Sequence, residues 1–202
     1  TSFNQDLSSW CVSKISSEPS GFDNGASAWS EPRPVWGSCP DFFRDPNGVT
    51  IRCSEASVGV SGTVDGVVYT KRARADITEG NAATTCTSGL TDLSGLFQAA
   101  TTFNGDITHW DTSAVTNMAN LFDGASAFNQ DISPWRVRQV TQMQAMFRNA
   151  TSFNQDLRSW CVDAFEQAPA AFAQGATAWT KAQPKWGECF IIFSDRFQAI
   201  NP

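Results

Sequence analysis

Internal repetition is the feature that most limits what this 202-residue chain can fold into. The string Phe-Asn-x-Asp begins at Phe3, Phe103, Phe128 and Phe153, and the last three copies recur with a constant period of 25. A Trp follows each of these phenylalanines seven residues later. The related strings TDLSGLF, TNMANLF and TQMQAMF recur with the same period, from position 91 onward. Residues 90–160 are therefore nearly three copies of one unit.

The chain also contains a second repeat with a longer period. Residues 1–39 align without a gap on residues 151–189, with 21 identities in 39 positions. The two copies are offset by 150 in residue number. We therefore expect the chain to contain the end of one cassette followed by a complete one, with further repeat sequence upstream.

The length of the unit predicts an α/β solenoid, because a unit of about 25 residues fits one leucine-rich-repeat-like coil. We expect a right-handed coil array with one short strand and one short helix per unit, plus a small β-hairpin cap or linker. Met118, Leu121, Phe122 and Ala125 have the i, i+3, i+4, i+7 spacing of a helix stripe, and a short strand is expected at 132–135. Stacked units would share one core. Its predicted members are Phe103, Trp110, Met118, Leu121, Phe122, Phe128, Trp135, Met143, Met146, Phe147, Phe153 and Trp160.

The repeats divide the chain into four segments. Residues 1–40 correspond to the C-terminal coils and cap of a preceding array, and residues 90–189 to a second array with its own C-terminal cap. Residues 41–89 between them are a predicted linker and N-terminal cap, in which the Asp65-Gly66 dipeptide indicates a tight hairpin turn. Residues 190–202 form a tail.

Charge and hydropathy exclude two classes of partner. Fourteen Lys and Arg residues against 20 Asp and Glu residues leave a net charge of −6, and a nucleic-acid binder needs a basic face. The longest apolar run, residues 190–193, is far too short to span a bilayer. We therefore expect neither a nucleic-acid partner nor a transmembrane segment in this chain.

Four of the six cysteines occupy equivalent positions in the two copies of the longer repeat. Cys11 and Cys39 are 28 positions apart, as are Cys161 and Cys189, and stacked coils lie close enough for a disulfide. Cys53 and Cys86 remain to pair with each other in the linker and cap. Zinc is the competing interpretation, but the chain has no Cys-x-x-Cys and a single His. Three disulfides predict an oxidising, extracellular compartment, secreted or at a cell surface.

The repeat resembles the leucine-rich repeats of BspA-like surface proteins, whose pattern is V-T-x-M-x-x-M-F-x-x-A-x-x-F-N-x-D-[IL]-x-x-W-D-T-S. Residues 115–139 contain VTNMANLFDGASAFNQDISPWRVRQ, and residues 140–161 continue the pattern. Residues 22–40 resemble the terminal coil of such arrays, and residues 47–53 and 62–70 resemble their cap. One departure is Arg-Val-Arg, which follows Trp135 in place of Asp-Thr-Ser. The resemblance implies extracellular proteins with roles in adhesion, matrix contact or surface coats.

Two recurring rows of side chains leave alternatives open. Asp106, Asp131 and Asp156 form either a weak calcium column or a ladder of turns in which Asn and Asp side chains bind backbone groups, which we favour. The Trp column is either core, which we favour, or a strip that stacks on glycans. The tryptophans near the ends of the two arrays are expected to be partly exposed: Trp29, Trp36, Trp179 and Trp186.

The sequence offers no catalytic constellation. His109 is the lone histidine, every Cys has an expected partner, and no Gly-x-Ser-x-Gly occurs. We therefore expect neither an enzyme nor a cofactor or metal. Asn149 begins the sequon Asn-Ala-Thr and is a possible glycosylation site.

These observations predict an extracellular structural or adhesive protein: a surface coat, fibre or attachment protein made of tandem cassettes. Its expected partners are further copies of itself, other surface or matrix proteins, or glycans. Residues 1–40 hold too few coils to stand alone, which suggests head-to-tail assembly into filaments. The alternative is a binding module that recognises a glycan or protein ligand on the solenoid face.

Overall fold

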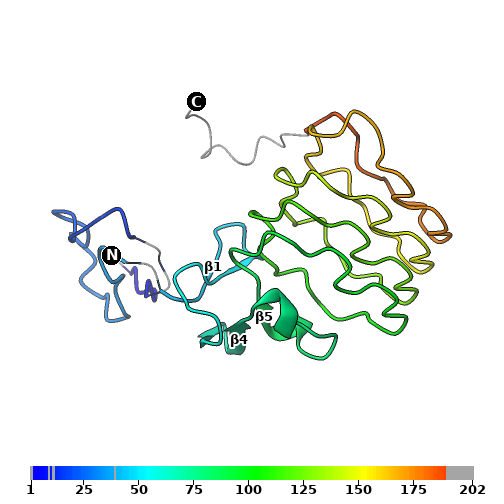
Figure 1. The fold of residues 1–202 in the computed structure, drawn as a ribbon. Coiled ribbons are helices and arrows are strands. Elements are labelled where there is room, and N and C mark those ends of the chain that lie inside the picture. Colours follow the sequence, from blue (N-terminus) through cyan, green and yellow to red (C-terminus); the bar gives the residue numbers. More distant parts are fainter. Residues whose placement is uncertain (1, 9, 11, 39, 190–202) are drawn as a thin grey trace.

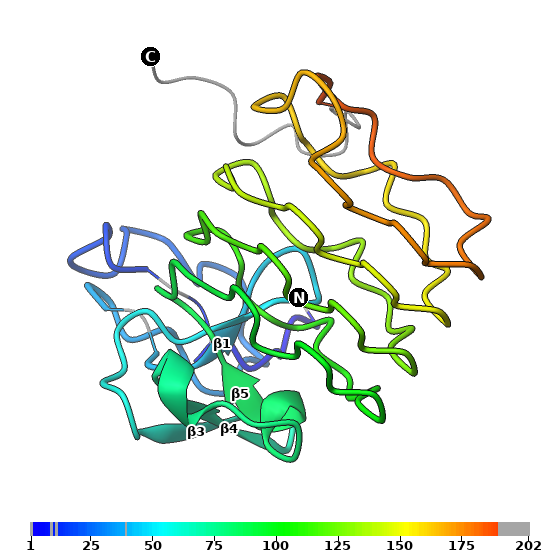
Figure 2. The same cartoon turned by 45° about the vertical axis from the view of Figure 1, so that its right-hand side comes forward.

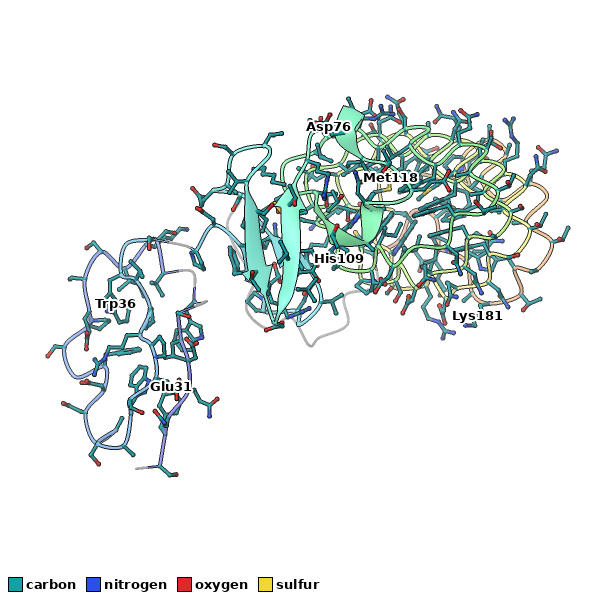
Figure 3. The ribbon with its side chains drawn as sticks, turned by 90° about the horizontal axis from the view of Figure 1, so that it is seen from below. Glu31, Trp36, Asp76, His109, Met118 and Lys181 are labelled. Carbon is teal, nitrogen blue, oxygen red and sulfur yellow. A yellow bond between two sulfur atoms is a disulfide. The ribbon has the colours of Figure 1, made fainter. Side chains whose placement is uncertain are left out.

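The computed structural model describes residues 2–8, 10, 12–38 and 40–189. From residue 90 onward the chain winds into successive coils that stack side by side (Figure 1). A region of short strands covers one end of this stack. The described residues between 2 and 38 form a separate pair of coils on the far side of the strands, where Trp36 and Glu31 lie (Figure 3).

The cap between these parts holds two small sheets. In the first, β1 (Phe43–Arg44) pairs antiparallel with β2 (Ile51–Arg52). The second has the order β3-β4-β5, made of Ser61–Val64, Val67–Lys71 and Thr85–Cys86, with β4 and β5 parallel. Asp65 and Gly66 connect β3 to β4, and both have the positive φ that a type I′ turn requires. Two 3₁₀ turns, η1 (Arg74–Asp76) and η2 (Ala82–Thr84), lie between β4 and β5.

Backbone hydrogen bonds hold neighbouring coils together. The Leu93 N–H donates to the Asn117 carbonyl over 2.9 Å, and the Met118 N–H donates to the Gln142 carbonyl over 2.8 Å. Parallel bridges connect Asp92 to Asn117 and Asn117 to Gln142. Each coil therefore presents the same groups to its neighbour, and the stack continues as long as the repeat does.

The predicted helix of each unit is not formed. The N–H groups of Met118, Asn120, Phe122 and Gly124 donate to carbonyls of the next coil, whereas an α-helix would keep them within itself. Asn120 and Gly124 have φ values of 57° and 74°, and such left-handed residues interrupt a helix. The apolar stripe is thus made by consecutive turns. No helix among the described residues is long and apolar enough to cross a membrane.

The predicted strand at 132–135 is also wrong. The bridges that connect the coils lie elsewhere, at Asp92, Asn117 and Gln142. Trp135 instead closes a turn, in which its N–H donates to the Ile132 carbonyl over 3.1 Å. The alternation typical of a strand is absent from this segment, which fits the turn.

Aromatic columns fill the inside of the stack. The ring centroids of Phe103 and Phe128 are 5.8 Å apart, as are those of Phe128 and Phe153, and the ring planes in both pairs are nearly parallel. Trp110 and Trp135 stack in the same way at 6.1 Å. All side chains named above as predicted core are buried. A turned view of the backbone shows the coils running side by side as roughly parallel bands (Figure 2).

Candidate functional site

A network of charged side chains lies where the cap meets the stack, and we call it the junction. Its charged members are Asp45, Arg52, Asp111 and Arg136. Arg52 Nη1 is 2.9 Å from Asp111 Oδ2, and Arg52 Nε is 2.8 Å from Asp45 Oδ2. Arg136 Nη2 is 3.2 Å from the other oxygen of Asp45. Two carboxylates and two guanidinium groups therefore alternate along the boundary.

Repeat geometry explains which residues meet there. Asp111 and Arg136 each follow a coil Trp, the position that Cys161 holds in a later coil. Stacking places equivalent positions in one row, and the segment that contains β1 and β2 runs along that row. Arg136 stands where the repeat pattern has Asp, and an Asp at this position would face the Asp45 carboxylate in place of the ion pair.

Hydrogen bonds complete the surroundings of the two carboxylates. Asp111 is almost fully buried, and it accepts hydrogen bonds from the hydroxyls of Ser88 at 2.8 Å and Ser113 at 2.7 Å. Partial burial raises the pKa of Asp45, but the Asn47 N–H and the Arg52 guanidinium outweigh this and hold that pKa below its usual value. The junction is thus a satisfied ion network. Loss of Arg52 should be costly because it leaves the buried carboxylates of Asp45 and Asp111 without their charge partner, whereas the exposed Arg136 contributes little.

His109 lies at the same boundary (Figure 3). Its Nε2–H donates to the Thr85 carbonyl over 3.0 Å, and its own carbonyl accepts the Ile51 N–H at 2.9 Å. The ring also packs 5.0 Å from that of Tyr69. Burial lowers the pKa of His109, against the opposing effect of the hydrogen bond to Thr85. A neutral imidazole with these partners joins the cap to the stack.

Two of the three predicted disulfides are formed in the described residues. Cys53 bonds to Cys86, with Cα atoms 6.3 Å apart, and Cys161 bonds to Cys189, with Cα atoms 4.1 Å apart. The predicted Cys11–Cys39 bond lies outside the described residues. The Asp163 carboxylate lies within 4.8 Å of Cys161 and Cys189. Since those sulfurs are bonded to each other, they are not free to act as thiolate ligands.

The recurring Asn and Asp residues form a ladder of hydrogen bonds. The side-chain oxygen of Asn104 accepts the Asn129 N–H at 2.9 Å, and that of Asn129 accepts the Asn154 N–H at 2.8 Å. The Asp106 and Asp131 carboxylates each accept the N–H two residues later within their own turn.

The three calcium candidates form no common cluster in the described part of the chain. The Arg158 guanidinium binds the Asp156 carboxylate and lowers its pKa. Partial burial raises the pKa of Asp106, but hydrogen bonds from Thr108 bring it below its usual value. These contacts favour the turn ladder over a calcium column.

Within the array the Trp column is buried, and each of its indole N–H groups donates a hydrogen bond to a backbone carbonyl. The indole N–H of Trp135 donates to the Ile107 carbonyl over 3.0 Å, and that of Trp160 donates to the Ile132 carbonyl over 3.1 Å. Trp110 does the same to Ala82. Trp110, Trp135 and Trp160 are at most 3% exposed, so these three rings have no face left for a glycan. The terminal tryptophans at 29, 36, 179 and 186 are half-buried.

The repeat segment matches a known protein family. A family model described as "Mycoplasma protein of unknown function, DUF285" matches residues 69–186, which is more than half of the chain. This chain belongs to the DUF285 family. No curated protein and no solved structure matches it.

The residues matched by the DUF285 model include only part of the junction. Asp111, His109 and Arg136 lie within the matched range, whereas Asp45 and Arg52 lie before it. The family segment therefore supplies one side of the ion network, and the preceding hairpin of β1 and β2 supplies the other. Sequence reasoning missed Asp45, Arg52 and Arg136. Their one signal was the Arg that replaces Asp after Trp135.

Asn149, the possible glycosylation site, lies at an exposed turn of the DUF285 segment. Its φ is 57°, and its N–H donates to the Gln174 carbonyl over 2.8 Å. The side chain lies close against Gly175, where a Cβ would collide with it. Modification of Asn149 remains a prediction.

A hollow of about 310 Å³ lies between the N-terminal coil pair and the cap. Its wall includes Asp6, Phe42 and Asp65. The Asp6 carboxylate accepts the Ser8 N–H, and the Asp65 carboxylate pairs with Arg44. Both acidic groups are thus engaged locally.

Proposed function

We propose that this chain is an extracellular structural or adhesive repeat protein: part of a surface coat, fibre or attachment protein built from BspA-like cassettes. The observation that carries this proposal is the use of the recurring polar side chains. The Asn ladder and the indole N–H groups bind neighbouring coils. A repeat that directs its polar groups into its own stack is suited to a scaffold.

The disulfides support an extracellular location. Cys53–Cys86 ties the cap to the start of the stack, and Cys161–Cys189 ties together its last coils. Disulfides persist in oxidising compartments and are rare in reducing ones. The BspA-like pattern of the repeat supports the same location.

The stack also supports a fold proposal. Coils that are each one repeat long, parallel bridges at equivalent positions and a continuous aromatic core are the features of a leucine-rich-repeat-like solenoid. We infer membership of that class, with consecutive turns in place of its helices.

A more specific proposal is that residues 1–40 mediate assembly of the chains into filaments. Head-to-tail assembly would have to place these residues on the last open coil of another chain. In this chain residues 151–188 already cover that coil, through contacts such as the Asn149 N–H to the Gln174 carbonyl. A filament of intact chains therefore requires exchange of the terminal coils. Light scattering over a concentration series tests it, and a monomer at every concentration would exclude it.

Antibody labelling of intact source cells tests the location. We expect antibodies against the chain to label unpermeabilised cells as strongly as permeabilised ones. An antibody against a cytosolic protein, which labels only permeabilised cells, is the control. Labelling that appears only after permeabilisation would contradict the proposal.

A glycan array and a panel of immobilised matrix proteins separate scaffold from binding module. A scaffold predicts no single strong ligand on either surface. One clear, saturable ligand would establish the binding-module alternative, in which the solenoid face recognises a glycan or protein.

A further inference from the structure

Residues 2–38 and 152–188 form two coil pairs with the same internal structure. We call them the N-terminal pair and the C-terminal pair. The Leu7 N–H donates to the Pro32 carbonyl as the Leu157 N–H donates to the Ala182 carbonyl, both over 2.9 Å. The Trp29 indole donates to Gln5 as the Trp179 indole donates to Gln155.

The aromatic contacts within the two pairs also agree. Phe3 meets Trp29 edge-to-face at 5.2 Å, and Phe153 meets Trp179 in the same way at 4.8 Å. Phe22 with Trp36 and Phe172 with Trp186 are both edge-to-face at 4.8 Å. Each pair is therefore built to the same plan, as the 21 shared identities predict.

The two pairs differ in what covers them. Phe153 and Trp160 are 0% and 1% exposed, because the coil before them packs Phe128 and Phe147 against Phe153. Phe3 and Trp10, at the equivalent positions, are 43% and 49% exposed. The N-terminal pair thus presents an apolar face that its twin buries.

Backbone groups on this face are also open. In the C-terminal pair, the carbonyls of Ala170, Phe172 and Gln174 accept N–H groups of Ala145, Phe147 and Asn149. Within the described residues no N–H donates to the equivalent carbonyls, which are Ser20, Phe22 and Asn24.

The donors on the face follow the same rule. The Asn154 N–H and the Trp160 indole N–H donate to the preceding coil, at Asn129 and Ile132. The equivalent donors are the backbone N–H of Asn4 and the indole N–H of Trp10, and neither has an acceptor among the described residues. The open face therefore carries counterparts of these three carbonyls and two N–H groups, with which its twin binds a coil.

We propose that this face of the N-terminal pair binds a coil of the same repeat, presented by an array that has no terminal pair of its own. Such a coil supplies N–H groups for the carbonyls at Ser20, Phe22 and Asn24. It also supplies a phenylalanine ring for Phe3 and a carbonyl for the Trp10 indole. The inference rests on these contacts and is independent of the proposed surface role.

The occupant is not the chain's own array. The last coil of that array, residues 126–150, is already bound by the C-terminal pair through the Phe147 N–H to the Phe172 carbonyl at 2.8 Å. In a second intact copy, the same coil is covered by that copy's own C-terminal pair. Binding there would displace that pair and form no more contacts than it breaks.

An extended chain tests the proposal. Residues 41–150 are placed directly before Thr1 of the full 202-residue chain, so that Ala150 is followed by Thr-Ser-Phe as in the natural order at Thr151. Hydroxyl-radical footprinting with mass spectrometry then measures oxidation of Trp10. We expect the Trp10 rate to fall at least tenfold, to that of Trp160 in the same molecule. An unchanged Trp10 rate in an extended chain whose added disulfide has formed would overturn the proposal.

The 202-residue chain gives a test that does not depend on folding of the extension. Trp10 must be oxidised at least tenfold faster than Trp160 at low concentration. A slow Trp10 in a monomer would show that the face is not open. Protection that appears only with rising concentration, together with a dimer in sedimentation, would identify a second intact copy as the occupant and overturn the proposed one.

Trp10→Arg in both chains is the matched variant. In the 202-residue chain it should leave the footprint of all other residues unchanged, because the side chain is half in solvent. In the extended chain it should restore oxidation of the last coil of the added segment. Val68→Arg, at an exposed position of the cap, should do neither. If Trp10→Arg leaves the oxidation of the added coil unchanged in the extended chain, that result would count against the proposal.

Discussion

Phe3 and Phe153 have the same local sequence, but we expect them to contribute very differently to the free energy of unfolding. Both lie in the string Thr-Ser-Phe-Asn-Gln-Asp-Leu. Phe153 is fully buried, with Phe128 at 5.8 Å, Phe147 at 4.3 Å and Trp179 at 4.8 Å. Among the described residues, the one ring that Phe3 contacts is Trp29 of its own coil pair.

The magnitudes follow from burial. Phe153→Ala removes a fully buried ring and leaves a cavity between stacked coils, so it should lower the free energy of unfolding by about 3–5 kcal/mol. Phe3 is 43% exposed. Its ring therefore loses only part of the roughly 1.5–3 kcal/mol of a full transfer from water, and the open side leaves no cavity. Phe3→Ala should cost about 1 kcal/mol on this basis.

Urea unfolding of the two variants and the unchanged chain, followed by tryptophan fluorescence and circular dichroism, measures both values. The work is done at low concentration so that Phe3 is not covered by another molecule. An unchanged dependence on urea is the control that the variants still unfold from the same structure. Equal costs for Phe3→Ala and Phe153→Ala would refute the reasoning, because they would mean that both rings are equally buried.

Three further predictions concern charge and cross-linking. Burial lowers the pKa of His109 in the folded chain, so the free energy of unfolding should fall as pH drops below the unfolded pKa of about 6.5. His109→Gln keeps a hydrogen-bond donor for the Thr85 carbonyl and should flatten this pH dependence, measured by urea unfolding at pH 5–7. Replacing Cys53 and Cys86 by Ala opens a loop with a sequence separation of 33 and should cost roughly 3–4 kcal/mol, seen as a lower Tm. The Arg148 guanidinium lowers the pKa of Asp123, so this pair stabilises above the unfolded pKa and is lost as pH falls through the lower, folded value. Asp123→Asn should cost about 1 kcal/mol at pH 7 and remove that acid-side loss, measured by urea unfolding at pH 2–7.

The repeat made much of the core predictable. Positions such as Phe128 and Met143 recur once in every unit, and a residue that recurs in a stack meets its own copies. The pairing of Cys161 with Cys189 followed from the same regularity. The Asp65-Gly66 turn was predictable because few dipeptides accept two consecutive positive φ values.

The stripe of Met118, Leu121, Phe122 and Ala125 predicted a helix that the fold does not form. Spacing reports which side chains are buried, and consecutive turns bury the same positions as a helix. What decides between them is whether the N–H groups find partners within the coil or in its neighbour. That information lies in the stack and not in the local sequence.

The amino-acid sequence alone determined that the chain repeats, which side chains face inward, and which cysteines are equivalent, because all three depend on periodicity. Only the tertiary structure decided where the linker lies, and hence that Arg52 meets Asp111 and Arg136 meets Asp45. It alone also distinguished Phe3 from Phe153, since their sequences are the same and the coil beside them is not. Burial depends on the neighbour that covers a side chain, and a neighbour is a property of the fold.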